Sequence, residues 1–147
     1  MKREYRWMVV LPVAACLQLA GCKHTPEDTE EPKAVHVEHL DGPEPARITL
    51  AAEAAKRLQM QTDVVRETEI DGARRLVMPY AAILYDTQGA TWVFTSPQPL
   101  TYMRHSITVD HIVGDVVVLT EGPPAGTAVV TVGAAELYGS EIEFEEE

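Results

Sequence analysis

Short segments of the chain alternate between apolar and polar residues, which is the pattern of β-strands whose two faces meet different surroundings. In residues 91–95 this alternation places Trp92 and Phe94 on one face. Ile107 and Val109 share a face in the same way. Further strand-like segments are residues 47–50, 60–70, 76–78, 80–85 and 129–132. The pattern predicts an all-β fold.

Turn signals separate the expected strands at close spacing, at Asp71-Gly72 and at residues 86–89, 113–115 and 122–126. Five residues are assigned to backbone geometry rather than chemistry: Pro79, Gly89, Gly114, Gly122 and Gly126. The apolar run at residues 116–119 predicts a strand buried on both faces, which favours a small barrel over an open sheet. Residues 51–58 are strong helix formers and predict one short helix. The barrel is expected to span residues 47–140.

The first 21 residues have the organisation of a cleaved signal peptide. Three basic residues lie within the first seven, and the apolar run that follows, residues 8–20, is shorter than the ~20 residues that a membrane-spanning helix needs. The run ends in Leu-Ala-Gly-Cys, which resembles the lipobox of bacterial lipoproteins. Cys22 is therefore the expected lipidation site, since processing at Cys16 would leave a much shorter apolar segment. The mature protein is expected on the periplasmic face of the inner or outer membrane, held there by its acyl chains.

Residues 22–46 combine several prolines with many acidic residues and have no sustained apolar period. Such a segment buries too little apolar surface to offset the entropy of ordering it, so we expect a solvated, disordered tether. The acidic tail at residues 141–147 is expected to fray or to form an edge of the sheet.

The charge balance and the cysteines exclude several classes of protein. The 147 residues contain 12 lysines and arginines against 23 aspartates and glutamates, a net charge of −11. Nucleic-acid binding needs a basic surface and is excluded on this ground. Because Cys16 and Cys22 both lie near the leader, neither a disulfide framework nor a cysteine-based zinc site is expected in the folded unit.

The strongest candidates for metal binding are His36 and His39, which flank Glu38 within the expected tether. A flexible tether gives no closed ligand geometry, so solvated histidines are the favoured interpretation and no cofactor is expected. His105 and His111 are interpreted as packed or edge residues, with His111 on the inward face of its strand.

No pattern of a catalytic site is present. The three serines lack the G-x-S-x-G turn, and no glycine-rich loop opens a helix to bind phosphate. Three carboxylates near the expected hairpins, those of Asp110, Asp115 and Glu121, are expected to face water. We therefore expect a protein that is not an enzyme.

Several segments, in order, resemble one known family. Residues 77–94 contain a strand begun by Val77-Met78-Pro79, a hairpin glycine and the strand Trp92-Val93-Phe94. Residues 102–109, the Gly-Asp hairpin at 114–115 and the closing pattern G-x-x-x-G-x-x-V-V-x-x-G-A-x-x-L at 122–137 follow. Together they resemble the last part of the periplasmic adaptor subunits of RND-type efflux pumps, also called membrane fusion proteins. Residues 48–62 resemble an early segment of the metal- and drug-efflux adaptors.

The resemblance implies a shortened adaptor. In full adaptors a lipoyl-like domain and a helical hairpin separate the two segments, whereas here residues 63–76 alone join them. The implied fold is the membrane-proximal, permuted SH3-like domain, and the implied partner is an RND permease or another adaptor. Without the hairpin, docking to an outer-membrane channel is not expected. The alternatives are a small metal- or ligand-binding periplasmic lipoprotein without a pump partner, and an inactive remnant of an adaptor.

Overall fold

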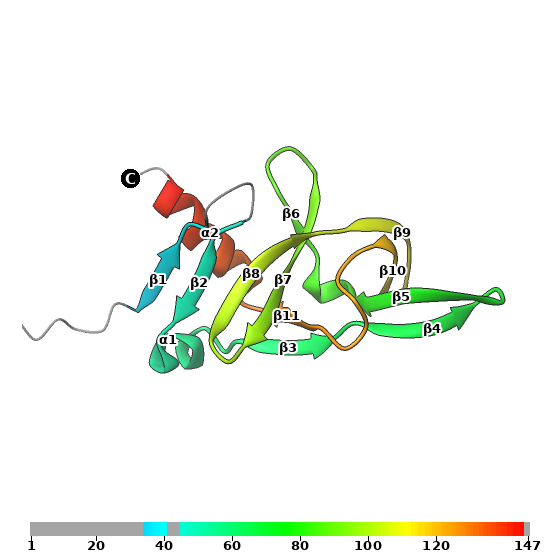
Figure 1. Ribbon diagram of the computed structural model, residues 1–147, viewed down its shortest axis with the longest axis horizontal. Helices are drawn as coiled ribbons and strands as arrows, with labels where there is room; N and C mark the ends of the chain where they lie inside the picture. The colour runs from blue at the N-terminus through cyan, green and yellow to red at the C-terminus, as the bar shows by residue number, and fades with distance from the viewer. Residues whose placement is uncertain (1–33, 41–44, 146–147) are drawn as a thin grey trace, which may run out of the picture.

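The computed structural model describes residues 34–40 and 45–145 of the chain, whose strands form two antiparallel sheets (Figure 1). The first sheet has the order β1 (Val35–Glu38), β2 (Arg47–Leu50), β8 (Thr101–Ser106), β7 (Thr91–Gln98), β11 (Ala128–Val132) and β3 (Gln61–Val64), and β6 (Leu84–Tyr85) pairs with β7. The second has the order β4 (Arg66–Ile70), β5 (Ala73–Pro79), β10 (Val116–Glu121) and β9 (Thr108–Val113). The helices are α1 (Ala52–Arg57), the 3₁₀ turn η1 (Tyr80–Ala82) and α2 (Ala134–Glu145).

The predicted β-rich class is confirmed, but the sheets do not close into a barrel. The barrel was inferred from the apolar run at residues 116–119, and its burial on both faces is confirmed for Val117, Val118 and Leu119. Val117 and Leu119 enter a core between the two sheets, while Val118 lies on the opposite face beside its strand partner Val77. An open sheet that is packed on both faces thus has the same apolar sequence pattern as a closed barrel, and this is why the pattern was interpreted as a barrel.

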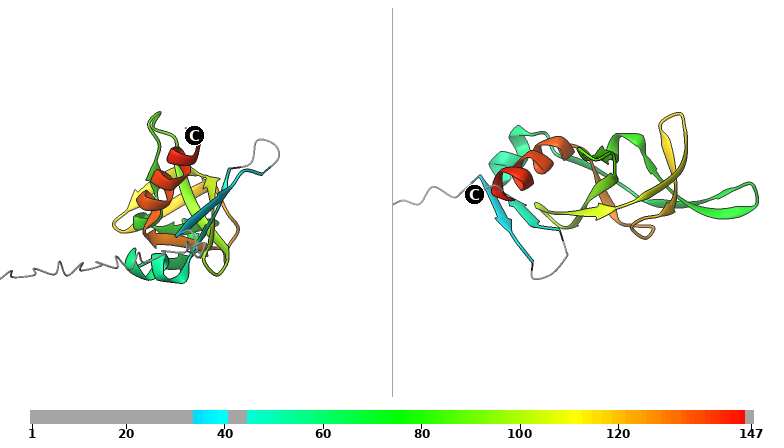
Figure 2. Two further views of the ribbon diagram at one scale, coloured as in Figure 1. Left: turned by 90° about the vertical axis from the view of Figure 1, so that its left-hand side faces the viewer. Right: turned by 90° about the horizontal axis from the view of Figure 1, so that it is seen from above.

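Two hydrophobic cores lie on opposite faces of the first sheet. Along β7, Val93 enters the core shared with the second sheet, and Phe94 enters the core beneath the helices. Along β11, Val129 and Val130 divide in the same way. The first sheet is therefore a central layer, with α1 and α2 on one face and the second sheet on the other (Figure 2).

Two segments that the sequence assigned to the tether and the tail are ordered elements. β1 lies within residues 22–46 and pairs antiparallel with β2, burying Val37. Residues 141–145, expected to fray or form an edge, belong to α2, which Leu137 anchors in the core. Both elements are stabilised by residues that lie far away in the sequence. The short β1 and the glutamate-rich α2 therefore have no local sequence pattern that predicts them. Residues 1–21, expected to be a signal peptide, lie outside the described residues. So do Cys22 and the other residues of the expected tether, apart from 34–40 and 45–46.

The predicted turns are mostly confirmed. Asp71 and Gly72 have φ values of 51° and 74°, as a tight two-residue hairpin turn between β4 and β5 requires. Gly89, Gly114 and Gly126 also have positive φ, and Pro79 ends β5 directly before η1. At position 122 glycine is favoured for a different reason, because a Cβ there would lie 2.8 Å from the Leu119 side chain. The strand expected at residues 80–85 is wrong: η1 occupies its first half, and β6 is only two residues long.

Gly133 gives a testable contrast with Gly126. Both have positive φ, 96° and 89°, but a Cβ at Gly133 would also overlap the sulfur of Met60, whereas the space at Gly126 is open. Gly126→Ala is expected to cost about 1 kcal/mol of unfolding free energy through backbone strain alone. Gly133→Ala is expected to cost about 1–3 kcal/mol more, through the added overlap. Urea denaturation checks this, and equal losses in the two variants would contradict it.

Candidate functional site

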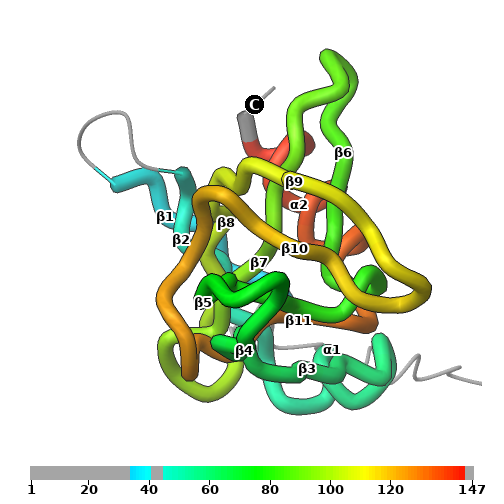
Figure 3. The backbone as a smooth tube through the Cα atoms, turned by 90° about the vertical axis from the view of Figure 1, so that its right-hand side faces the viewer, coloured from blue at the N-terminus to red at the C-terminus, as the bar shows by residue number. Residues whose placement is uncertain are grey.

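Residues of β3 and of the second sheet line a groove of about 550 Å³. Figure 3 views the backbone from the end of the molecule that carries the β4–β5 hairpin. Three strands and one turn supply the lining of the groove: Asp63 at the end of β3, Arg66, Glu67 and Thr68 on β4, Val77, Met78 and Pro79 on β5, and Asp115 and Val116 where β9 turns into β10. The groove therefore joins residues that lie up to about fifty positions apart in the sequence.

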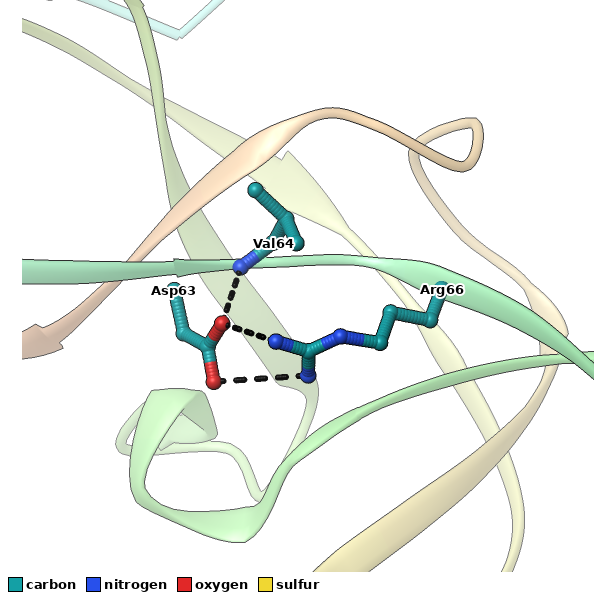
Figure 4. Close-up of polar contacts among 3 residues, drawn as sticks. All are labelled: Asp63, Val64 and Arg66. Carbon is teal, nitrogen blue, oxygen red and sulfur yellow. Dashed lines mark hydrogen bonds and ion pairs between the residues drawn. The ribbon is translucent and has the colours of Figure 1, made fainter.

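One wall of the groove is an ion pair between Asp63 and Arg66 (Figure 4). The Arg66 Nη2 donates to Asp63 Oδ1 at 2.6 Å, and Nη1 donates to Oδ2 at 3.4 Å. The backbone N–H of Val64 donates to the same Oδ1 at 2.7 Å. This backbone hydrogen bond first, and the Arg66 guanidinium second, lower the pKa of Asp63 below 3.8, so the carboxylate is ionised at neutral pH.

The groove has an apolar floor that continues onto an exposed rim. Strand register pairs Arg66 with Val77 and Pro79 with Val116, which places these four side chains on one face of the sheet. Val77 is buried, whereas Val116 is 42% exposed. Apolar surface thus extends from the floor onto the turn between β9 and β10.

The residues that line the groove include charges of both signs. Asp63, Glu67 and Asp115 are acidic, and Arg66 is the only cation among the lining residues. Arg66 is engaged by Asp63, and Glu67 contacts Arg74 only at 3.8 Å, between exposed side chains. By strand register Glu67 lies opposite Leu76, on the other face of the sheet from Val77 and Pro79. Arg75, opposite Thr68, lies on the same face as Val77. The apolar floor is therefore flanked by side chains of both charges.

The structure places the predicted metal candidates apart from this groove. His36 is exposed on β1, and the His39 ring lies 5.3 Å from the ring of Phe144 on α2. Within residues 34–40 and 45–145, no group of three or more histidine, cysteine, aspartate or glutamate side chains is arranged to hold a metal ion. Cys22, the expected lipidation site, lies outside this part of the chain.

The inward orientation expected for His111 is wrong. A register shift next to Leu119 lets Val109 pair with Leu119 and His111 with Val118, so Asp110 is an extra residue in the strand. Such a bulge reverses the alternation beyond it. His111 is therefore exposed, with Nδ1 3.2 Å from Asp110 Oδ2. Asp110, Asp115 and Glu121 are exposed, as expected.

A buried cluster around Arg104 was not predicted from the sequence. Its guanidinium carbon lies 4.4 Å from the centre of the Trp92 ring and 5.4 Å from that of Tyr138, and its Nε lies 3.2 Å from Glu141 Oε2. The side chain of Glu141 is 1% exposed and that of Arg104 17%. These residues come from β7, β8 and α2, so the cluster fixes α2 on the first sheet.

The hydrogen bonds of Asp86 predict that the stability of the fold depends on pH. Its carboxylate accepts hydrogen bonds from the indole N–H of Trp92 at 2.9 Å and from the backbone N–H groups of Gln88 and Ala90 at 2.8 Å each. The bond from Trp92 is the main cause that lowers the pKa of Asp86 below 3.8. A carboxyl group with a lowered folded-state pKa stabilises the fold above its unfolded-state pKa, and this contribution disappears as pH falls through the folded-state value.

We therefore expect Asp86→Asn to lower the free energy of unfolding at neutral pH and to flatten its decline as the pH falls below about 5. Urea titrations across that range measure the slope. The matched variant is Asp71→Asn, at the tip of the β4–β5 hairpin, which is expected to keep the slope of the natural protein. If the stability of Asp86→Asn declines with pH as steeply as that of the natural protein, Asp86 is not a cause of the decline.

Comparisons with known proteins give no relative from which a function can be transferred: no family model, no curated protein and no solved structure matches the chain. Among the residues described here, no helix has both the length and the apolar character needed to cross a bilayer. The function is therefore inferred from the residues of this chain and their arrangement.

Proposed function

We propose that this protein is a non-catalytic lipoprotein of the cell envelope that is related to the adaptor subunits of RND-type efflux pumps. Acyl chains on Cys22 hold it to the membrane, and its folded part contributes to efflux by contacting an RND permease or another adaptor. The observation that carries the proposal is the joining of two distant adaptor-like segments, residues 48–62 and 77–137, into one folded unit.

The pairing between the two segments is direct. Ile48 on β2 lies opposite Tyr102 on β8, and Thr62 on β3 lies opposite Val130 on β11. Ile48, Tyr102 and Val130 meet again in the core beneath the helices. A chain made from two ends of a longer adaptor would need this complementarity in order to fold, because the core beneath the helices takes buried residues from both segments.

The short connection between the segments also agrees with the proposal. Residues 66–79 form the β4–β5 hairpin, closed by the Asp71-Gly72 turn. A hairpin returns the chain to the sheet it left, so it can replace a large insertion without disturbing the strands on either side.

Contact rather than catalysis is favoured by the groove. Asp63 is ionised and held by Arg66, which makes it a poor proton donor or acceptor near neutral pH. The apolar floor beside it offers surface for packing rather than a reacting group.

Affinity purification tests the proposal. The full-length, tagged protein is extracted from its native membranes in a mild detergent, and the co-purifying proteins are identified by mass spectrometry. An RND permease or adaptor subunit is expected with the natural chain and not with Cys22→Ser, which lacks the thiol needed for anchoring. If replicate purifications of the natural chain contain neither partner, the proposal is wrong.

A further inference from the structure

Met60 lies between the end of α1 and β3, and the backbone fixes its position. Gln59, which follows α1, has a φ of 53°, and its N–H donates to the carbonyl of Lys56 at 3.1 Å. The N–H of Met60 donates to the carbonyl of Ala55 at 3.0 Å. These two hydrogen bonds form a Schellman motif, in which an apolar side chain just beyond the helix packs back against its last turn. The fold therefore holds Met60 against the helix that it follows.

The sulfur of Met60 packs on the backbone where α2 begins. A Cβ at Gly133 would overlap this sulfur and lie 3.0 Å from the Met60 Cε. The carbonyl of Gly133 accepts a hydrogen bond from the N–H of Leu137 at 3.1 Å, which starts the helix. Met60 also packs against the core that contains Leu137. The thioether thus fills the space that glycine leaves open, and no further atom fits between the sulfur and the Gly133 backbone.

Among the methionines of the described residues, Met60 combines partial exposure with a contact at α2. Met78 is 1% exposed and lies in the core between the two sheets. Met103 is partly exposed, but its neighbour Tyr102 lies in the core beneath the helices, so alternation along β8 directs Met103 to the other face of the sheet. Oxidation turns an apolar thioether into a polar sulfoxide and disrupts the packing around it. Only at Met60 would this change act on α2.

We propose that Met60 is an oxidation site, and that its sulfoxide loosens α2 from the first sheet. The oxidant is a hydroperoxide. The sulfur forms a bond to one peroxide oxygen and loses two electrons, the O–O bond breaks, and the proton of the transferred oxygen passes to the leaving oxygen. With hydrogen peroxide the leaving group is water.

The geometry explains why the sulfoxide would act on the helix. Its oxygen finds no space against Gly133, and the apolar core beside it offers no hydrogen-bond donor for it. The side chain of Met60 therefore leaves its place, and the start of α2 loses that packing. The inference goes beyond the proposed function and does not depend on it, because it concerns a chemical modification of this chain alone.

Peroxide treatment of the full-length protein, extracted from its membranes in a neutral detergent, tests the inference. Peptide mass spectrometry measures sulfoxide at each methionine, and hydrogen–deuterium exchange measures the opening of each element. We expect Met60 to be oxidised about tenfold faster than Met78, which is sealed in its core. Exchange of the α2 amides is then expected to rise about tenfold, while exchange of the β10 amides stays unchanged.

Two pairs of matched variants locate the effect. Met60→Leu and Met103→Leu nearly conserve volume and cannot form a sulfoxide. After peroxide treatment we expect α2 to stay closed in Met60→Leu and to open in Met103→Leu as in the natural chain. Met60→Gln places a polar side chain at the site without any oxidant, and it is expected to speed α2 exchange about tenfold. Met103→Gln is expected to leave α2 exchange within about twofold.

Several outcomes would overturn the inference: oxidation of Met60 no faster than that of Met78, unchanged α2 exchange once Met60 is fully oxidised, or equal responses to peroxide in Met60→Leu and the natural chain. Equal α2 exchange in Met60→Gln and Met103→Gln would also overturn it, independently of any oxidant. None of these measurements involves a partner protein. Their failure leaves the proposed function standing, and failure of the affinity purification leaves this inference standing.

Discussion

Replacing Arg104 by methionine is expected to lower the free energy of unfolding by about 3 kcal/mol. The change keeps much of the side-chain volume but removes the cation that faces Glu141, whose side chain is 1% exposed. It also removes the contacts of the guanidinium with the rings of Trp92 and Tyr138. A buried carboxylate that loses its cation keeps the full cost of leaving water, and that cost makes the effect large.

Arg74→Met is the matched control for Arg104. Arg74 also contacts a glutamate, Glu67, but at 3.8 Å and with its side chain 81% exposed. Pairs of this kind contribute less than about 1 kcal/mol. Urea denaturation of both variants measures the difference. A loss in Arg104→Met no larger than that in Arg74→Met would show that the cluster does not hold α2 in place.

The second large effect is expected for Leu137→Ala, at about 2–5 kcal/mol. Leu137 is fully buried and brings α2 into the core that contains Phe94 and Ile48. The alanine leaves a cavity where the helix meets the sheet, and the loss grows with the volume of that cavity. Circular dichroism and urea denaturation measure it.

Phe144→Ala, on the same helix, is the comparison for Leu137. Phe144 is larger than leucine but 40% exposed, and its ring lies against His39. Its replacement is expected to cost less, about 1–2 kcal/mol, because a large part of the ring already contacts solvent and its loss leaves no closed cavity. If the two variants lose equal stability, burial of Leu137 is not what docks α2.

Local pattern predicted much of the sheet structure. The alternation at Trp92 and Phe94 and the Asp71-Gly72 turn depend on neighbouring residues, and both are present in the fold. Closure of the sheets into a barrel is not a local property. The run at residues 116–119 indicated burial on both faces, but the residues that cover those faces come from other strands.

The elements that were missed depend on distant contacts. β1 exists through its pairing with β2, and α2 through Leu137 and the Arg104 cluster. The groove was missed for the same reason, since two of its lining residues, Asp63 and Asp115, are far apart in the sequence. The spacing of Asp63 and Arg66 fits an ion pair, but it does not reveal which strands pack beside it. A bulge at Asp110, invisible in the sequence, reversed the orientation of His111.

The arrangement of the two ends of the molecule agrees with an anchored protein that makes contact with a partner. β1, where the described part of the chain begins, lies beside α2 at one end, and the β4–β5 hairpin lies at the other (Figures 1 and 2). The anchor proposed at Cys22 would join the folded part through β1, which is the first described element of the chain. The groove on the second sheet would then lie away from the point of attachment.

Photocrosslinking in intact cells tests the central claim most directly. The full-length protein carries a benzoylphenylalanine at position 116 in the groove or at position 132 on β11, and the adducts formed on irradiation are identified by mass spectrometry. The account predicts an adduct with an RND permease or adaptor from position 116, absent from position 132 and lost when Cys22 is replaced by serine. Adducts with neither class of protein at position 116, in protein shown to be folded and membrane-bound, would contradict it.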